Sequence, residues 1–185
     1  MLEIIGCSIS GNEAGGLREP GLGGGIYNAS GAEIAIIDSI ISGNWADEGG
    51  GIYNAGSMQI ARTTISDNFV GDAFSQQTSL GGGICNSGTL DIVNSAITGN
   101  KASGSLQSGD IGGGIFNDGT LAMANSTISG NLAGSTGVFP GGGGGITNGS
   151  GNIVIQNSTI NATSLKARVA LVSAAMSSWP KAPWR

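Results

Sequence analysis

The sequence predicts an all-β chain in which short strands stack into a single parallel solenoid. Three observations support this. A Gly-Gly-Gly-Ile motif recurs five times along the chain, and apolar residues within each repeat alternate with a period of two. In addition, 36 of the 185 residues are Gly and only 4 are Pro. Glycine at this frequency without a strict three-residue period excludes collagen and is typical of closely spaced turns.

The repeats consist of two motifs. The first is Gly-Gly-Gly-Ile-x-Asn, and its copies are separated by 26, 32, 31 and 31 residues. Its isoleucines are Ile26, Ile52, Ile84, Ile115 and Ile146. The second motif follows each copy of the first and ends in Ile-Ser-Gly-Asn or a close variant, as in 90–100 and 121–131. The segment 2–12 fits the second motif, so we expect the chain to open in the middle of a repeat.

The period-two alternation, as in Leu90 and Ile92, predicts half-buried strands. Stacking equivalent strands aligns their apolar residues in one continuous core, which gives a rod of five to six rungs, each rung being one turn of the chain. We assign residues 1–163 to this solenoid. Residues 164–185 form a C-terminal cap or tail outside the repeat. The apolar spacing of four and three residues there favours a helix that covers the open end of the core. The apolar residues of this stripe are Leu165, Val169, Val172, Met176 and Trp179.

Asparagines at fixed repeat positions are expected to form ladders, because amides one rung apart can hydrogen-bond to each other. Three ladders are predicted. One contains Asn28, Asn54, Asn86, Asn117 and Asn148, and the second contains Asn12, Asn44, Asn68, Asn100 and Asn131. The third is mixed and contains Gly6, Asp38, Arg62, Asn94, Asn125 and Asn157. Asp38 and Arg62 are neighbours in this third ladder and should form an ion pair.

The composition excludes several classes of function. The formal net charge is −5 and the basic residues are scattered, so a nucleic-acid partner is not expected. The chain has no His, which removes His-based catalysis and imidazole metal ligands. Cys7 and Cys85 are too few for a disulfide framework or a Cys₄ zinc site, and no metal site is predicted from them. No apolar run is long enough for a transmembrane helix.

The paired motifs, Gly-Gly-Gly-Ile-Tyr-Asn and Asn-Ser-Thr-Ile-Ser-Gly-Asn, resemble the repeats of right-handed parallel β-helix proteins. They are especially similar to the repeats of polymorphic outer-membrane proteins, although those repeats carry Phe-x-x-Asn in place of Ile-Ser-Gly-Asn. The resemblance covers residues 2 to about 163. It implies a secreted or surface-displayed bacterial protein with adhesive or structural work. No cofactor is expected from the sequence apart from Ca²⁺, considered below. The wider pectin-lyase-like superfamily implies polysaccharide lyases and hydrolases as an alternative.

An outward position lies between each motif Ile and its Asn, and it is occupied by Tyr27, Tyr53, Cys85, Phe116 and Thr147. Aromatic side chains there can stack on sugar rings, so Tyr27, Tyr53 and Phe116 are candidate substrate-binding residues. The competing interpretation is an aromatic ladder that stabilises the sheet or lies under loops.

The loops before each Gly-Gly-Gly differ in length, and 45–48 is much the shortest. A short loop between two long ones predicts a cleft with Trp45, Asp47 and Glu48 on its floor, and with Arg18 and Asp72 on its walls. Trp45 and Arg18 would bind a sugar. In an enzyme, Glu48 would be the general acid and Asp72, or else Asp47, its carboxylate partner. Acidic oxygens also suit Ca²⁺, and an acidic loop rim needs neither role.

Two ranks of outward residues, mostly Ser and Thr, flank the inward Ile of the second motif. The first is Ser8, Ile40, Thr64, Ala96, Thr127 and Thr159, and the second is Ser10, Ser42, Ser66, Thr98, Ser129 and Asn161. Such ranks resemble ice-binding solenoids, but hydroxyl side chains are also ordinary outward strand residues.

Taken with the resemblance, these patterns favour a non-catalytic β-helical module at the cell surface or in the extracellular space, which binds a polysaccharide or another surface ligand. A polysaccharide hydrolase or lyase is the alternative, and an ice-binding solenoid is the minor one.

Overall fold

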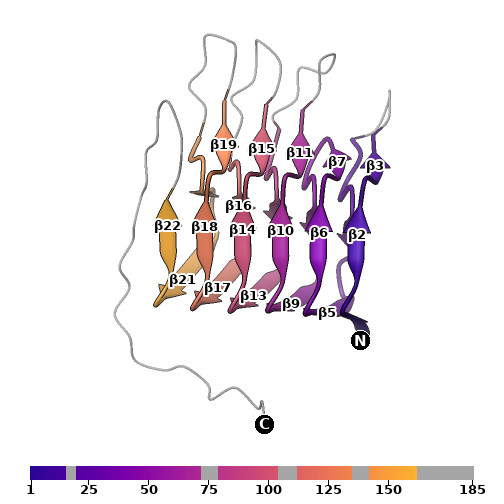
Figure 1. The fold of residues 1–185 in the computed structure, drawn as a ribbon, viewed down its shortest axis with the longest axis vertical. Helices are drawn as coiled ribbons and strands as arrows, with labels where there is room; N and C mark the ends of the chain where they lie inside the picture. Colours follow the sequence, from indigo (N-terminus) through magenta and orange to yellow (C-terminus); the bar gives the residue numbers. More distant parts are fainter. Residues whose placement is uncertain (16–19, 72–78, 104–111, 135–141, 162–185) are drawn as a thin grey trace.

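The computed structural model describes residues 1–15, 20–71, 79–103, 112–134 and 142–161. Within them the chain consists of parallel strands of two to five residues that form four sheets running along one rod (Figure 1). Each complete turn contributes one strand to every sheet. Four complete turns, β4–β7, β8–β11, β12–β15 and β16–β19, are flanked by the partial turns β1–β3 and β20–β22.

The first two sheets have six strands each. The first sheet contains β1 (Leu2–Ile5), β5 (Glu33–Ile37), β9 (Ser57–Ala61), β13 (Thr89–Val93), β17 (Thr120–Ala124) and β21 (Asn152–Gln156). The second contains β2 (Ser8–Ser10), β6 (Ile40–Ser42), β10 (Thr64–Ser66), β14 (Ala96–Thr98), β18 (Thr127–Ser129) and β22 (Thr159–Asn161).

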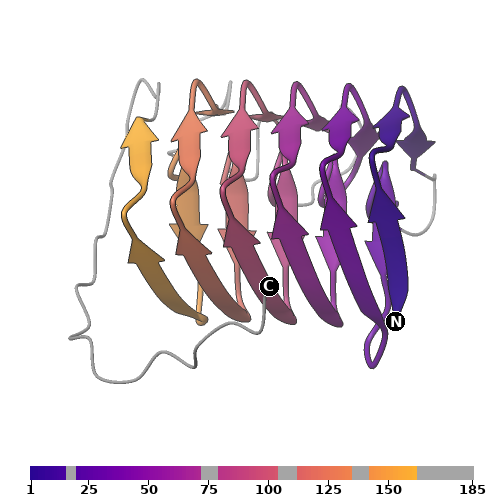
Figure 2. The ribbon, with the colours of Figure 1, turned by 60° about the horizontal axis from the view of Figure 1, so that its bottom comes forward.

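The other two sheets have five strands each. The third sheet contains β3 (Glu13–Ala14), β7 (Trp45–Ala46), β11 (Phe69–Val70), β15 (Lys101–Ala102) and β19 (Leu132–Ala133). The fourth contains β4 (Ile26–Asn28), β8 (Ile52–Asn54), β12 (Ile84–Asn86), β16 (Ile115–Asn117) and β20 (Ile146–Asn148). The coil winds in a right-handed sense from the first sheet through the second and third to the fourth (Figures 1 and 2). The predicted parallel β-helix is confirmed.

Equivalent residues pair directly across adjacent turns. Ile84 of β12 pairs with Ile52 of β8 and with Ile115 of β16, so the inward isoleucines form a continuous column. Ile52, Ile84 and Ile115 have no exposed surface. Leu90 and Ile92 from the first sheet and Ile97 from the second complete the same core. Burial of this apolar column is the main contribution that holds the turns together.

The Gly-Gly-Gly turn at 49–51 contains glycines required for two different reasons. Gly49 lies in the left-handed region with φ +62°, where residues with a side chain are disfavoured. Gly51 instead lies where a Cβ atom would come within 2.8 Å of the Gly83 carbonyl oxygen and 2.9 Å of the Asn68 Nδ2. The turns are therefore stacked too closely for any side chain at that position.

Both predicted ladders of asparagines are confirmed. In the fourth sheet, Nδ2 of each Asn donates to Oδ1 of the next at 2.7–2.8 Å, from Asn28 through to Asn148. In the second ladder the corresponding distance is 2.9 Å, and the backbone N–H of each Asn donates to the same Oδ1. The amides within the rod are buried, and the ladders satisfy them at the corners of each turn.

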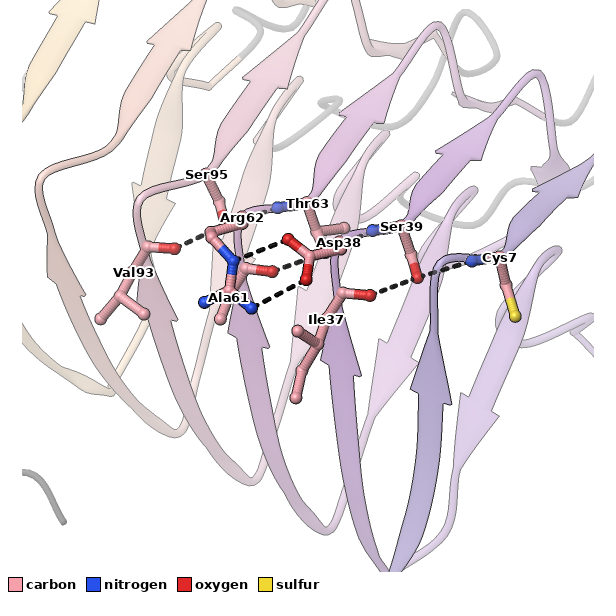
Figure 3. Close-up of polar contacts among 9 residues, drawn as sticks. All are labelled: Cys7, Ile37, Asp38, Ser39, Ala61, Arg62, Thr63, Val93 and Ser95. Atoms are coloured by element: carbon pink, nitrogen blue, oxygen red, sulfur yellow. Dashed lines mark hydrogen bonds and ion pairs between the residues drawn. The ribbon is translucent and has the colours of Figure 1, made fainter. Parts of the chain in front are cut away.

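The third predicted ladder exists as a column of positions but not as a chain of amide hydrogen bonds. Within the described chain no hydrogen bond joins the side chains of Asn94 and Asn125. What the six positions share is a left-handed backbone with φ between 47° and 62°. Gly and Asn tolerate this conformation, which explains the pattern. The predicted ion pair between Asp38 and Arg62 is present (Figure 3).

A ladder of hydroxyls, not predicted from the sequence, runs directly beside this column. The backbone N–H of each member donates to the hydroxyl oxygen of the next, as from Thr63 to Ser95 at 3.1 Å. Each hydroxyl donates in turn to the carbonyl two residues earlier, as from Ser95 to Val93 at 2.7 Å. Cys7 occupies the first position, where its backbone N–H donates to the Ser39 hydroxyl at 3.1 Å (Figure 3). Its thiol donates to the Ile5 carbonyl at 3.3 Å. The ladder contains Ser39, Thr63, Ser95, Ser126 and Ser158.

The predicted helical stripe and the whole of the proposed segment 164–185 lie beyond residue 161, where the described residues end. The described residues contain no helix that is long and apolar enough to cross a membrane.

Candidate binding surface

Among the residues that the structure describes, the most exposed aromatic side chain is at the start of the fourth sheet. Tyr27 of β4 is 52% exposed, and its ring stacks on that of Tyr53 in β8, with centroids 5.6 Å apart and planes 22° apart. Tyr53 is half-buried, and this burial raises the pKa of its phenol. Among the described strands β4 is the edge of the sheet, so Tyr27 has no neighbour on its other face from that sheet. The two rings form a small aromatic platform that ends in an open ring face.

The platform does not continue along the rod, which corrects the predicted outward rank. Phe116 and Cys85 are only 7% and 3% exposed, so neither is available to a ligand. The Phe116 ring packs over Gly149 of the following turn, where an added Cβ would lie 3.2 Å from Cζ of the ring. Burial raises the pKa of the Cys85 thiol, which leaves it neutral. Both positions stabilise the sheet, and Phe116 is therefore removed from the candidate ligand-binding residues.

Glu48 lies in the turn that leads into β8, the strand that carries Tyr53. Its backbone forms isolated bridges to Leu22 on one side and Leu80 on the other, so that loop residues continue the stacking between the third and fourth sheets. The side chain is half-buried. Desolvation raises the pKa of its carboxyl, and the nearby Asp47 charge raises it further. Burial is the largest cause of the raised pKa of Tyr53, and the Glu48 charge makes a smaller contribution in the same direction.

The neighbouring Asp47 has a structural contact. Its Oδ2 accepts a hydrogen bond from the backbone N–H of Gly21 at 2.7 Å, which ties the preceding loop to the turn. The chain bends at Asp47. The Asp47 carboxylate therefore holds the preceding loop, whereas the adjacent Glu48 carboxylate is half-buried in the turn. Arg18 and Asp72, the other predicted members of the cleft, lie outside the described residues.

Trp45 belongs to another sheet. It lies in β7 of the third sheet, paired with Glu13 and Phe69, whereas the tyrosines lie in the fourth sheet. Its ring covers Gly15 so closely that a Cβ there would overlap the ring. On the same rank, Lys101 Nζ lies 5.6 Å from the centroid of the Phe69 ring, a cation–π contact. The sequence grouped Trp45 with Glu48 because they are close along the chain, but their side chains belong to different parts of the turn.

The two ranks of mostly Ser and Thr lie on the outer face of the second sheet in the predicted register, as in the pairing of Ser66 with Ser42 and Thr98. Ile40 interrupts one rank and is 49% exposed. Sequence analysis missed Leu22 and Leu80, which form the backbone bridges to Glu48. They come from loops of different length, so no repeat pattern marks them.

The described residues contain no cluster of three or more His, Cys, Asp or Glu side chains able to hold a metal ion.

One family of known proteins matches a segment of the chain. Residues 38–55, which run from β6 through β8, match the Chlamydia polymorphic membrane protein (Chlamydia_PMP) repeat. Neither a curated protein nor a solved structure matches the chain at a significant level. The chain is a β-helix repeat protein that resembles these repeats. The match indicates, at a coarse level, a protein of the surface or outer membrane.

Proposed function

We propose that this chain is a non-catalytic module of a secreted or cell-surface protein, and that it binds carbohydrate at the platform of Tyr27, Tyr53 and Glu48. The observation that carries the proposal is the open, stacked ring pair held on a rigid sheet. Sugar rings present an apolar C–H face that packs on an aromatic ring, and a rigid aromatic side chain loses little entropy on binding.

The Glu48 carboxylate complements the platform. A partly desolvated carboxylate is a strong hydrogen-bond acceptor and can receive hydroxyl protons from a sugar stacked on Tyr27. Tyr53 and Glu48 are anchored by turns stacked on either side, since β8 pairs with β4 and β12, and Glu48 bridges Leu22 and Leu80. A shallow sugar site needs such fixed geometry, because its weak contacts cannot offset a large loss of conformational entropy in the protein.

A glycan array with the full chain tests the proposal, followed by calorimetry on any sugar that binds. Tyr27→Ala should weaken binding about tenfold, as expected for one aromatic contact of about 1.4 kcal/mol. Tyr27→Phe should retain most of the affinity, because it keeps the ring. Ile40→Ala is the matched control, since Ile40 is also an exposed, outward strand residue but lies on the second sheet.

If Tyr27→Ala binds the sugar with unchanged affinity, the ligand binds to another face of the rod. A complete absence of glycan binding would leave a structural rod without this site. The same sugars, incubated as polysaccharides and examined for reducing ends and unsaturated products, test the enzymatic alternative. Turnover lost in Glu48→Gln would replace the binding proposal with catalysis.

A further inference from the structure

We propose that Asn125 is an acceptor for N-linked glycosylation, in which a sugar is attached covalently to its side-chain amide. Asn125, Ser126 and Thr127 form the acceptor motif, which is Asn, any residue except Pro, and then Ser or Thr. The motif lies at the corner between β17 and β18, with described turns stacked on both sides of it. This modification is separate from sugar binding at the platform of Tyr27 and Tyr53.

The backbone at this corner places both recognised side chains on the outer surface of the rod. Asn125 has φ 50° and is exposed. Ser126 is only 3% exposed, and its hydroxyl donates to the Ala124 carbonyl at 2.8 Å. Thr127, the first residue of β18, is exposed again. The amide and the hydroxyl that define the motif are therefore open to an enzyme, at the corner where the first sheet meets the second (Figures 1 and 2).

The fold uses the backbone of Asn125 and leaves its amide unused. The backbone N–H donates to the Gln156 carbonyl of the next turn at 3.1 Å. Among the described residues none forms a hydrogen bond with the side chain of Asn125 or with the Thr127 hydroxyl. The left-handed backbone does not need an amide either, since Gly6 occupies the same position with φ 62°. A sugar on this Nδ2 therefore displaces no hydrogen bond of the rod.

The other copies of the motif differ from Asn125 in burial or in hydrogen bonding. Asn28 is 1% exposed and belongs to the buried ladder. Asn148 is exposed, but its Nδ2 already donates to the Gly151 carbonyl. Asn157 repeats the position of Asn125 one turn further on, with φ 47°, and Thr163 of the last copy lies outside the described residues. The five copies begin at Asn28, Asn125, Asn148, Asn157 and Asn161.

The reaction needs an activated sugar, because the lone pair of an amide nitrogen is delocalised into the carbonyl group and is a weak nucleophile. The co-substrate is a sugar phosphate donor, either a nucleotide sugar or a lipid-linked sugar, held by a glycosyltransferase. A bond forms between Asn125 Nδ2 and the anomeric carbon, while the bond from that carbon to the phosphate oxygen breaks. The phosphate leaves with the electron pair, and Nδ2 gives up one proton to a base of the transferase.

The preceding turn provides a matched control within the same chain. Asn94 is exposed and has the same φ of 50° as Asn125, but Ala96 occupies the position of Thr127. The motif is therefore incomplete, and Asn94 should carry no sugar. Ala96→Thr completes the motif and should create a new acceptor at Asn94. The fold should tolerate this change, because Ala96 pairs with Thr64 on one side and with Thr127 on the other.

Mass spectrometry of the intact chain purified from its native cells tests the proposal, and fragmentation that keeps the sugar attached locates it. We expect the mass of a sugar on Asn125 and none on Asn94. Thr127→Ala, which leaves Asn125 in place, should reduce the occupancy of Asn125 at least tenfold, whereas Thr127→Ser should retain it. Circular dichroism checks that each variant is folded.

The two classes of donor are distinguished by producing the 185-residue chain in the same cells with and without an added export signal. Modification of the chain that is not exported indicates a nucleotide sugar in the cytoplasm. Modification only after export indicates a lipid-linked sugar, and either result supports the proposal.

An unmodified Asn125 in the chain from native cells would overturn the proposal. A sugar that persists in Thr127→Ala, or one found on Asn94 of the wild type, would also overturn it, because the hydroxyl two residues later would then not be recognised. None of these measurements involves binding at the platform of Tyr27 and Tyr53, so their failure leaves the carbohydrate proposal standing.

Discussion

Arg62 Nε lies 2.6 Å from Asp38 Oδ1, and its Nη2 lies 2.8 Å from Oδ2, so the two residues form a bidentate ion pair between adjacent turns. Both also have φ near 50°, in the left-handed region. The pair thus places Asp and Arg in a left-handed conformation at a position where the other turns carry Gly or Asn.

The first prediction concerns Arg62→Asn. The two side chains are 56% and 50% exposed, and such pairs contribute little because water screens them. Asn adopts the left-handed conformation more readily than Arg or Ala does. We therefore expect Arg62→Asn to melt roughly 2–4 °C above Arg62→Ala, as measured by calorimetry. An Ala variant that melts at or above the Asn variant would contradict the backbone explanation.

The second prediction is the pH dependence of the same pair. The hydrogen bond from Arg62 lowers the pKa of Asp38. A carboxyl with a lowered pKa in the folded state stabilises the protein above the pKa of the unfolded chain, and this contribution is lost as the pH falls through the folded-state pKa. The difference in melting temperature between the wild type and Arg62→Gln should therefore shrink below pH about 4. A difference that stays constant down to pH 2 would show that the charge of Asp38 does not matter.

The third prediction compares two positions in one ladder. Asn86 is fully buried, accepts from Asn54 and donates to Asn117, both at 2.7 Å. Asn86→Ala leaves buried partners without hydrogen bonds and should lower the free energy of unfolding by about 2–4 kcal/mol in urea titrations. Asn148 is exposed at the end of the ladder, so Asn148→Ala should cost less than about 1 kcal/mol. Equal losses would mean that the ladder does not act through burial.

The fourth prediction concerns the hydroxyl ladder. Ser95→Ala removes the acceptor for the buried Thr63 N–H, and it should cost about 1–2 kcal/mol and speed exchange of that amide. Ser95→Thr should be tolerated, because Thr63 occupies the equivalent place in the preceding turn and makes the same contacts. If Thr and Ala are equally destabilising at this position, packing rather than the hydroxyl decides the outcome.

The fifth prediction concerns Glu48. Desolvation, with a smaller contribution from Asp47, raises the pKa of this carboxyl. A raised carboxyl pKa destabilises the folded state once the pH exceeds the pKa of the unfolded chain, and the loss levels off above the folded-state pKa. Glu48→Gln should therefore be more stable than the wild type at pH 7 and should have no advantage below pH about 4. Glu33→Gln, which removes the same charge from an exposed position in β5, is the control and should gain less.

The sequence predicted those features of the fold that recur in every turn. The register of Ile52, Ile84 and Ile115, both amide ladders and the Asp38–Arg62 pair follow directly from the repeat spacing. The hydroxyl ladder recurs as well, but Ser and Thr are common outward residues in strands, so its pattern does not stand out in the sequence.

The candidate site was harder to predict, because it depends on what differs between turns. Phe116 and Tyr27 occupy equivalent positions, yet one is 7% exposed and the other 52%. The difference arises from a contact with Gly149 and from the sheet edge, which are tertiary features that alternation alone does not encode. Trp45 and Glu48 are three residues apart, but Trp45 lies in the third sheet and Glu48 in the turn between the third and fourth sheets.

The hydrogen bonds of every ladder join residues 24 to 32 positions apart in the chain, whichever turn they lie in. The loop that must close to form each new turn is therefore nearly constant in length, and adding turns does not raise its entropic cost. Folding can begin wherever two neighbouring turns first meet and then proceed turn by turn in both directions. A rod of this kind can grow longer during evolution without becoming slower to fold at each step.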